Sequence, residues 1–135
     1  GNSRFYTSMK FELPKIWTDR LNNGDLEGVL SLYEETALLL ATFDAHPLIR
    51  PSQRRNYFEG FMGRAGAGVE LDEASLSHNR LSENVYQATG LYVFFYEEGG
   101  VLVRQNARFT FIVSIKDSHL ILHHHSSLVP NANSE

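Results

Sequence analysis

Four strand-like segments follow one another in the second half of the sequence, with only short turns between them. They are predicted at residues 69–81, 85–96, 101–114 and 119–129. The intervening stretches SEN, EEGG and KDS consist of polar residues and glycine, which are typical of hairpin turns. Strands joined by such short turns must run antiparallel. This half of the chain is therefore restricted to one antiparallel sheet.

The first half predicts three helices. Pro14 suits the first turn of the first helix, which Asn23 and Gly24 end. Asp25 is placed to cap a second helix, and Ser52 a third. Apolar side chains recur at helical spacing in all three segments. They are Leu13, Ile16, Trp17 and Leu21; then Leu26, Val29, Leu30 and Tyr33; then Tyr57, Phe58, Phe61 and Met62.

Two short strands, at residues 36–43 and 48–50, are predicted between the second and third helices. The element order is then α-α-β-β-α-β-β-β-β, an α+β architecture with three helices on one side of one antiparallel sheet. No linker or repeat interrupts this order. We therefore expect a single domain at residues 13–130, with an N-terminal extension at 1–12 and a C-terminal tail at 131–135.

Composition excludes several classes of function. The 135 residues carry a net charge of −4 and no basic stripe, so nucleic acid is not an expected partner. The absence of cysteine excludes a thiol nucleophile and a disulfide framework. No apolar run reaches the roughly 18 residues of a membrane span, so no membrane partner is expected. The compartment stays open: cytoplasmic, or periplasmic or secreted if a signal peptide has been removed.

The segment LYVFFY, residues 91–96, is apolar at odd and even positions alike. A strand with one face in water should alternate instead. Helices can cover one face of this strand, and a second subunit is the simplest cover for the other. The alternative is a large aromatic patch beneath a loop. We expect the dimer, or a larger homo-oligomer.

Several motifs together resemble a known superfamily. They are Trp17 followed by NNGD and LEGVLSLY, then IR before YFEGF, then ARFTFIV, and finally HHHSSLVP. Their combination resembles the nuclear transport factor 2-like (cystatin-like, SnoaL-like) superfamily. Within it, the chain is most similar to the calcium/calmodulin-dependent protein kinase II association domain and to the SgcJ/EcaC branch. The resemblance spans about residues 13–130. It implies a cone-shaped domain in which a curved antiparallel sheet is wrapped around the N-terminal helices, with a cavity on the concave side of the sheet.

The resemblance also implies a set of cavity residues. It places Arg108 inside the cavity, with Tyr92, His124 and Ser126 as hydrogen-bonding walls. Trp17 and Tyr33, expected on the helices, wall it too. A buried guanidinium needs a partner, and a carboxylate-bearing small molecule would suit it. Strand alternation alone gives the opposite result for Arg108, which would then face solvent.

Three consecutive histidines, residues 123–125, allow three interpretations. His123 and His125 share one strand face and have metal-ligand spacing, but no third ligand is evident, so we expect neither metal nor cofactor. His124, on the other face, is a candidate acid–base catalyst. The simplest interpretation is that the histidines are hydrogen-bonded groups in the sheet or an interface. A carboxylate base is a weaker alternative, because Glu70 and Asp72 are more simply explained by an exposed edge.

Three functions remain open from the sequence. The first is a binding and assembly module with a cavity for a small anionic molecule. The second is a SnoaL-like enzyme of the isomerase, cyclase or dehydratase type, acting on a hydrophobic cyclic substrate through His124. The third is a structural oligomerisation domain with an incidental cavity, which a sealed or collapsed cavity would favour.

Overall fold

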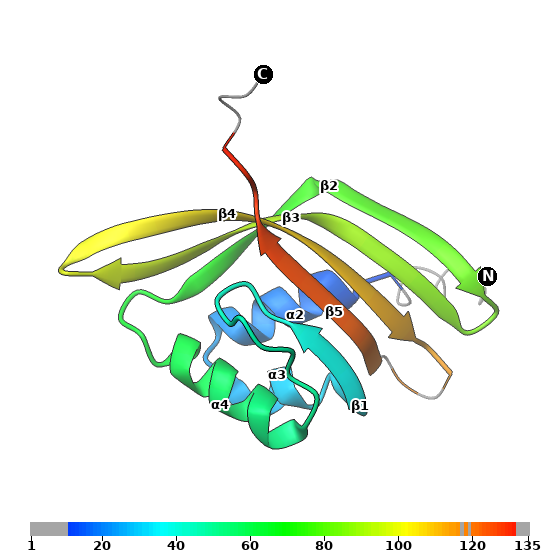
Figure 1. Cartoon of the computed structure of the whole chain (residues 1–135). Coiled ribbons are helices and arrows are strands. Elements are labelled where there is room, and N and C mark those ends of the chain that lie inside the picture. The colour runs from blue at the N-terminus through cyan, green and yellow to red at the C-terminus, as the bar shows by residue number, and fades with distance from the viewer. Residues whose placement is uncertain (1–10, 117, 119, 132–135) are drawn as a thin grey trace.

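The computed structural model describes residues 11–116, 118 and 120–131. In this part of the chain, three helices lie against one face of a curved five-stranded sheet (Figure 1). The helices are α2 (Leu13–Asn22), α3 (Leu26–Leu30) and α4 (Pro51–Met62). The strands are β1 (Tyr33–Leu40), β2 (Gly68–Ser82), β3 (Val85–Glu98), β4 (Val101–Ser114) and β5 (Leu120–Leu128). The predicted extension and tail lie almost entirely outside the described residues.

The sheet has the strand order β1-β5-β4-β3-β2. The four strands predicted in the second half form a continuous antiparallel meander from β2 to β5. The predicted α+β class and element order are confirmed. The sheet is mixed, because β1 pairs with β5 in parallel. No hairpin joins those two strands, so the turn argument that applies to the other four does not apply to them.

The elements between α3 and α4 differ from the prediction; the strand predicted at residues 36–43 is β1, at Tyr33–Leu40. Tyr33 does not end the second helix; it opens β1 and pairs with Ile121 of β5. The predicted strand at 48–50 is reduced to one bridge, in which Leu48 exchanges two backbone hydrogen bonds with Leu39, of 3.0 and 2.9 Å. Pro47 and Pro51 flank this segment and have no N–H to donate, which limits a longer ladder.

The helix ends follow the local chemistry of the sequence. Gly24 has φ of 69°, the left-handed conformation expected just after α2. The Asp25 carboxylate accepts a hydrogen bond of 2.9 Å from the Gly28 backbone N–H, which confirms it as the cap of α3. Helix α4 begins one residue before the predicted cap Ser52, with Pro51 in its first turn.

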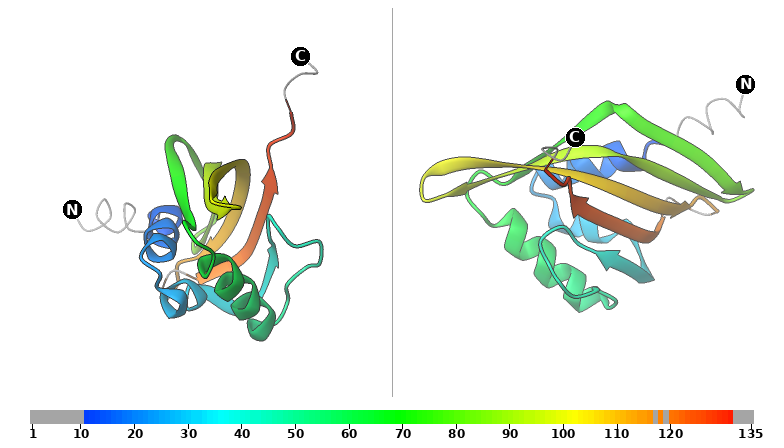
Figure 2. Two further views of the ribbon diagram at one scale, coloured as in Figure 1. Left: turned by 90° about the vertical axis from the view of Figure 1, so that its left-hand side faces the viewer. Right: turned by 45° about the horizontal axis from the view of Figure 1, so that its top comes forward.

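The sheet bends sharply where β2 bulges between Asp72 and Ser77 (Figure 1). Opposite the bulge lies Gly90 of β3, and a side chain there would crowd its neighbours. A Cβ atom on Gly90 would lie 3.0 Å from the Phe109 ring and 3.1 Å from the Ser75 hydroxyl. The bend directs the sheet around the helices, as the second viewing direction also shows (Figure 2).

The two faces of the sheet differ in what covers them. The inner face packs against the helices and carries the buried side chains of the core. From β3 and β4 these include Tyr86, Ala88, Tyr92, Phe94, Tyr96, Ala107, Phe109, Phe111 and Val113. No helix of the described residues covers the opposite face, called the outer face below (Figure 2). None of the described helices is long and apolar enough to cross a membrane.

Candidate functional site

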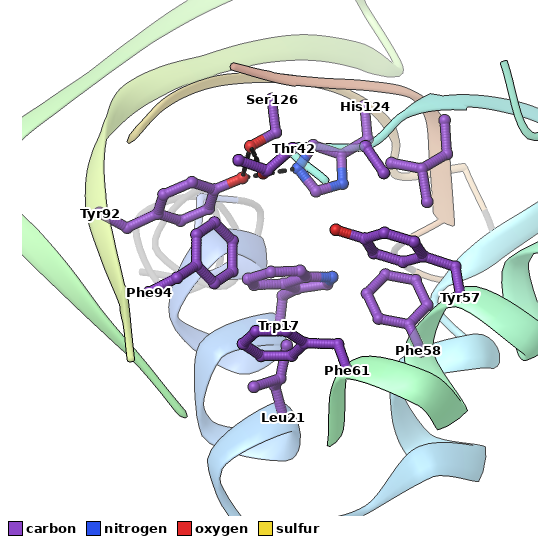
Figure 3. A pocket seen from close by; sticks show the side chains of 12 residues that line it. Trp17, Leu21, Thr42, Tyr57, Phe58, Phe61, Tyr92, Phe94, His124 and Ser126 are labelled. Atoms are coloured by element: carbon purple, nitrogen blue, oxygen red, sulfur yellow. Dashed lines mark hydrogen bonds between the residues drawn. The ribbon is translucent and has the colours of Figure 1, made fainter. Parts of the chain in front are cut away.

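A narrow pocket lies between the inner face of the sheet and helices α2 and α4 (Figure 3). Its free volume is about 10 Å³, roughly the room that one water molecule needs. Aromatic and aliphatic side chains make up most of the wall. The lining residues are Trp17, Leu21, Leu39, Ala41, Thr42, Tyr57, Phe58, Phe61, Tyr92, Phe94, His124 and Ser126. The cavity implied by the resemblance is thus nearly filled by the protein's own side chains.

A chain of hydrogen bonds runs along the pocket and is centred on His124. The Trp17 indole N–H donates to the Tyr33 hydroxyl at 3.1 Å. The Tyr33 hydroxyl lies 2.7 Å from Nδ1 of His124, and the Tyr92 hydroxyl lies 3.2 Å from Nε2. Tyr92 donates to the Ser126 hydroxyl at 2.6 Å, and Ser126 in turn bonds Thr42 (Figure 3).

These contacts determine which nitrogen of His124 carries the proton. The Tyr92 hydroxyl hydrogen is used on Ser126, so Nε2 must be the donor toward Tyr92. A neutral imidazole has one N–H, so Nδ1 must accept, and Tyr33 donates to it. All of these bonds therefore run in one direction, from Trp17 through Tyr33, His124 and Tyr92 to Ser126.

His124 is held in its neutral form by its surroundings. Its side chain is 2% exposed, and burial is the main cause that lowers its pKa to about 3, followed by the neighbouring His123 and His125. Burial has the opposite effect on the tyrosines, because the charged form of a phenol is the anion. It raises the pKa of Tyr33 and of Tyr92, which keeps both hydroxyls protonated.

This arrangement is suited to structure rather than to proton transfer near neutral pH. An efficient acid–base catalyst has a pKa near the working pH, and the pKa of His124 is far below it. The pocket lining includes no Asp, Glu, Lys or Arg. Among the described residues, no group of three His, Asp or Glu side chains is placed to hold a metal ion.

The structure brings five of the six predicted site residues together. Trp17, Tyr92, His124 and Ser126 line the pocket, and Tyr33 lies behind it within the hydrogen-bond chain. As expected, His123 and His125 point away from the pocket, toward the outer face. The role of these five side chains in binding a ligand stays a prediction.

The predicted placement of Arg108 in the cavity is wrong. Arg108 is exposed on the outer face, where its Nε donates to the Ser127 hydroxyl at 3.2 Å. Its strand neighbours Ala107 and Phe109 are buried on the inner face, so alternation turns Arg108 outward. Strand alternation alone gives the observed result, and the family resemblance gave the wrong one.

Among the described residues, the buried guanidinium belongs to Arg54 instead, a residue that sequence reasoning missed. Arg54 is 3% exposed and lies on α4. It donates to the backbone carbonyls of Glu34, Glu35 and Ala37 at 3.2, 3.0 and 2.8 Å, where β1 is irregular. The available signal was its position four residues before Phe58, because residues at that spacing lie on the same face of a helix.

Comparison with known proteins gives the context of this fold. A family model described as the calcium/calmodulin dependent protein kinase II association domain matches residues 11–130. A search of curated protein sequences finds no significant match.

Solved structures match over most of the chain. A Xanthomonas campestris protein assigned to the same association-domain class is 27% identical, with a TM-score of 0.80 over 90% of this chain and 86% of its own. An NTF2-like protein with a cystatin-like fold from Novosphingobium aromaticivorans is 11% identical, with a TM-score of 0.77 over 98% and 88%. A ketosteroid isomerase-like protein from Erwinia carotovora is 10% identical, with a TM-score of 0.75 over 92% and 96%. The last two likenesses concern the fold alone.

Proposed function

Because this chain belongs to the calcium/calmodulin-dependent protein kinase II association domain family, we propose that it is a self-association module whose outer sheet face packs against a second copy. The observation that carries the proposal is the uncovered apolar strand β3. Leu91 is 43% exposed on the outer face, and Val93 and Phe95 are only partly buried there. The alternating residues Tyr92 and Phe94 are buried on the inner face.

An apolar outer stripe on a sheet is costly in water unless something covers it. All described helices lie on the inner face, so no described helix of the same copy covers the stripe (Figure 1). A second copy presents the same stripe, and burying one against the other removes both from water. This is the two-sided strand that the sequence predicted at residues 91–96.

The inner pocket gives less support to the other two functions. An anionic ligand has no cationic side chain to meet in the lining, and the free volume is about 10 Å³. An acid–base enzyme would need a group that titrates near neutral pH, which neutral His124 does not supply. The third hypothesis, a structural association domain with an incidental cavity, fits a nearly filled pocket best.

The test is the effect of a charge on the outer stripe. Leu91→Lys is expected to convert an oligomer into a monomer in sedimentation equilibrium, because a lysine would replace the apolar contact at its centre. Ile49→Lys is the matched control, since Ile49 is also an exposed aliphatic residue, at 53%, but lies outside the sheet. A wild-type chain that stays monomeric at every concentration tested would contradict the proposal.

A further inference from the structure

The outer face carries three parallel columns of different chemistry, one on each of three neighbouring strands. The middle column is the apolar stripe of β3, including Leu91 and Val93. Arg108 of β4 lies directly opposite Leu91 on one side. Asp72 of β2 lies opposite Leu91 on the other side, and Glu70 lies opposite Val93. Opposed residues of antiparallel strands point to the same face, so the face is basic, apolar and acidic in that order.

The charges of the two outer columns lack an oppositely charged partner in the part of one copy that the structure describes. Among the described residues, neither Arg108 nor Asp72 nor Glu70 makes an ion pair. The Ser127 hydroxyl occupies only Nε of Arg108, which leaves the two terminal amino groups of the guanidinium for another acceptor. The Arg108 and Asp72 columns lie two strand spacings apart, roughly 10 Å, with β3 between them.

From this order of columns we infer that the two copies are related by a two-fold axis running nearly along β3, so that Arg108 of each copy pairs with Asp72 of the partner subunit. A rotation about that axis keeps the two apolar stripes together. It exchanges the sides of the face, so each basic column meets an acidic one. The inference rests on the proposed function and specifies its geometry.

The other symmetric arrangement is electrostatically unfavourable. An axis running across the strands would place β4 on β4 and β2 on β2, so that cations face cations and carboxylates face carboxylates. Like charges brought together in an interface disfavour that arrangement. Both axes give the nearly aligned strands that packed sheets adopt, so the order of the charges decides between them.

The shape of the face is consistent with the same axis. Around Leu91, a shallow hollow of about 550 Å³ is lined by residues from β2 to β5, which include Ser75, Arg108, His125 and Ser127. Under this axis the β4 and β5 part of the hollow faces the acidic column of the second copy. Its lining supplies hydroxyl, imidazole and guanidinium groups that can donate to a carboxylate.

A charge-exchange experiment tests the axis. Arg108→Asp and Asp72→Arg are each expected to weaken the wild-type dimer at least tenfold, because each variant places like charges together twice. The double variant Arg108→Asp/Asp72→Arg is expected to dimerise within about threefold of wild type. Mixing the two single variants should give a heterodimer, because every pair that meets in it is then opposite in sign. Sedimentation velocity and native mass spectrometry measure these species.

Arg104→Asp is the matched control. Arg104 lies on the same face of β4 as Arg108, but it is opposite Phe95 of β3, which is in turn opposite Gly68 of β2 and not an acidic residue. Combining it with Asp72→Arg should not restore the dimer. All of these charge variants change exposed side chains, and circular dichroism checks that they fold. If Leu91→Lys dissociates the dimer but the single charge variants do not, the axis is wrong and the association face stands. If the wild type never dimerises, both the axis and the proposed function fail.

Discussion

At the scale of single residues, His124 has the most tightly specified environment in the pocket. Each hydroxyl that flanks it accepts one hydrogen bond and donates another, so the proton on Nε2 cannot move without leaving a neighbour unsatisfied. A buried donor or acceptor without a partner costs about 1–3 kcal/mol. The neutral Nε2–H form is therefore part of the folded state.

This environment predicts a loss of stability in acid. In the unfolded chain His124 titrates near its ordinary pKa of 6.5, whereas in the folded chain its pKa is about 3. Below pH 6.5 the unfolded state binds a proton that the folded state excludes. The stability that depends on neutral His124 is therefore fully present above pH 6.5 and is lost as the pH falls toward 3. The free energy of unfolding should fall by up to about 1.4 kcal/mol per pH unit from this group.

Urea unfolding between pH 7.5 and 4.5 measures this slope. His124→Gln should lower the free energy of unfolding at pH 7.5. Below pH 6.5 it should reduce the slope of that free energy against pH by up to about 1.4 kcal/mol per pH unit, the effect of one bound proton. His46→Gln, which removes an exposed imidazole outside the pocket, is the comparison variant. Equal slopes for wild type and His124→Gln would show that His124 is not held neutral.

At the scale of elements, the bend of the sheet depends on the absence of a side chain at Gly90. Gly90→Ala is expected to destabilise the fold by about 1–2 kcal/mol, because its Cβ would press against Phe109 and Ser75. Gly60 in α4 is the matched control, since a Cβ there meets nothing within 4 Å. Gly60→Ala should stabilise by about 0.5–1 kcal/mol. Thermal and urea unfolding distinguish these opposite signs.

The elements themselves were largely predictable, because their ends are determined by local chemistry. Gly24, Asp25 and the hairpin turns act within a few residues of their position. The errors in the predicted elements lie where contacts between distant parts of the chain determine the structure. Tyr33 joins β1 because it pairs with Ile121 of β5, and no local pattern reports that pairing. In the site, alternation put His124 and Ser126 on one strand face, and the family resemblance turned that face toward the pocket, as the structure has it. The same resemblance misplaced Arg108.

For the protein as a whole, the proposed self-association links stability to protein concentration. Anything that binds only the folded state stabilises it by mass action, and a second copy is such a ligand. We expect the melting temperature to rise by about 3 °C for each tenfold increase in concentration. Leu91→Lys should remove this dependence, while Ile49→Lys should retain it. Differential scanning calorimetry over a hundredfold concentration range measures both.

The edges of the sheet determine what kind of assembly can form. At one edge, Leu48 occupies part of the free side of β1 through its bridge to Leu39. At the other, β2 is interrupted by its bulge and carries charged side chains along its exposed length. Bulged and charged edges resist pairing with another strand. In the proposed association, copies of this chain therefore meet through their sheet faces and do not pair edge to edge. Such an assembly closes on itself and resists growth into fibrils.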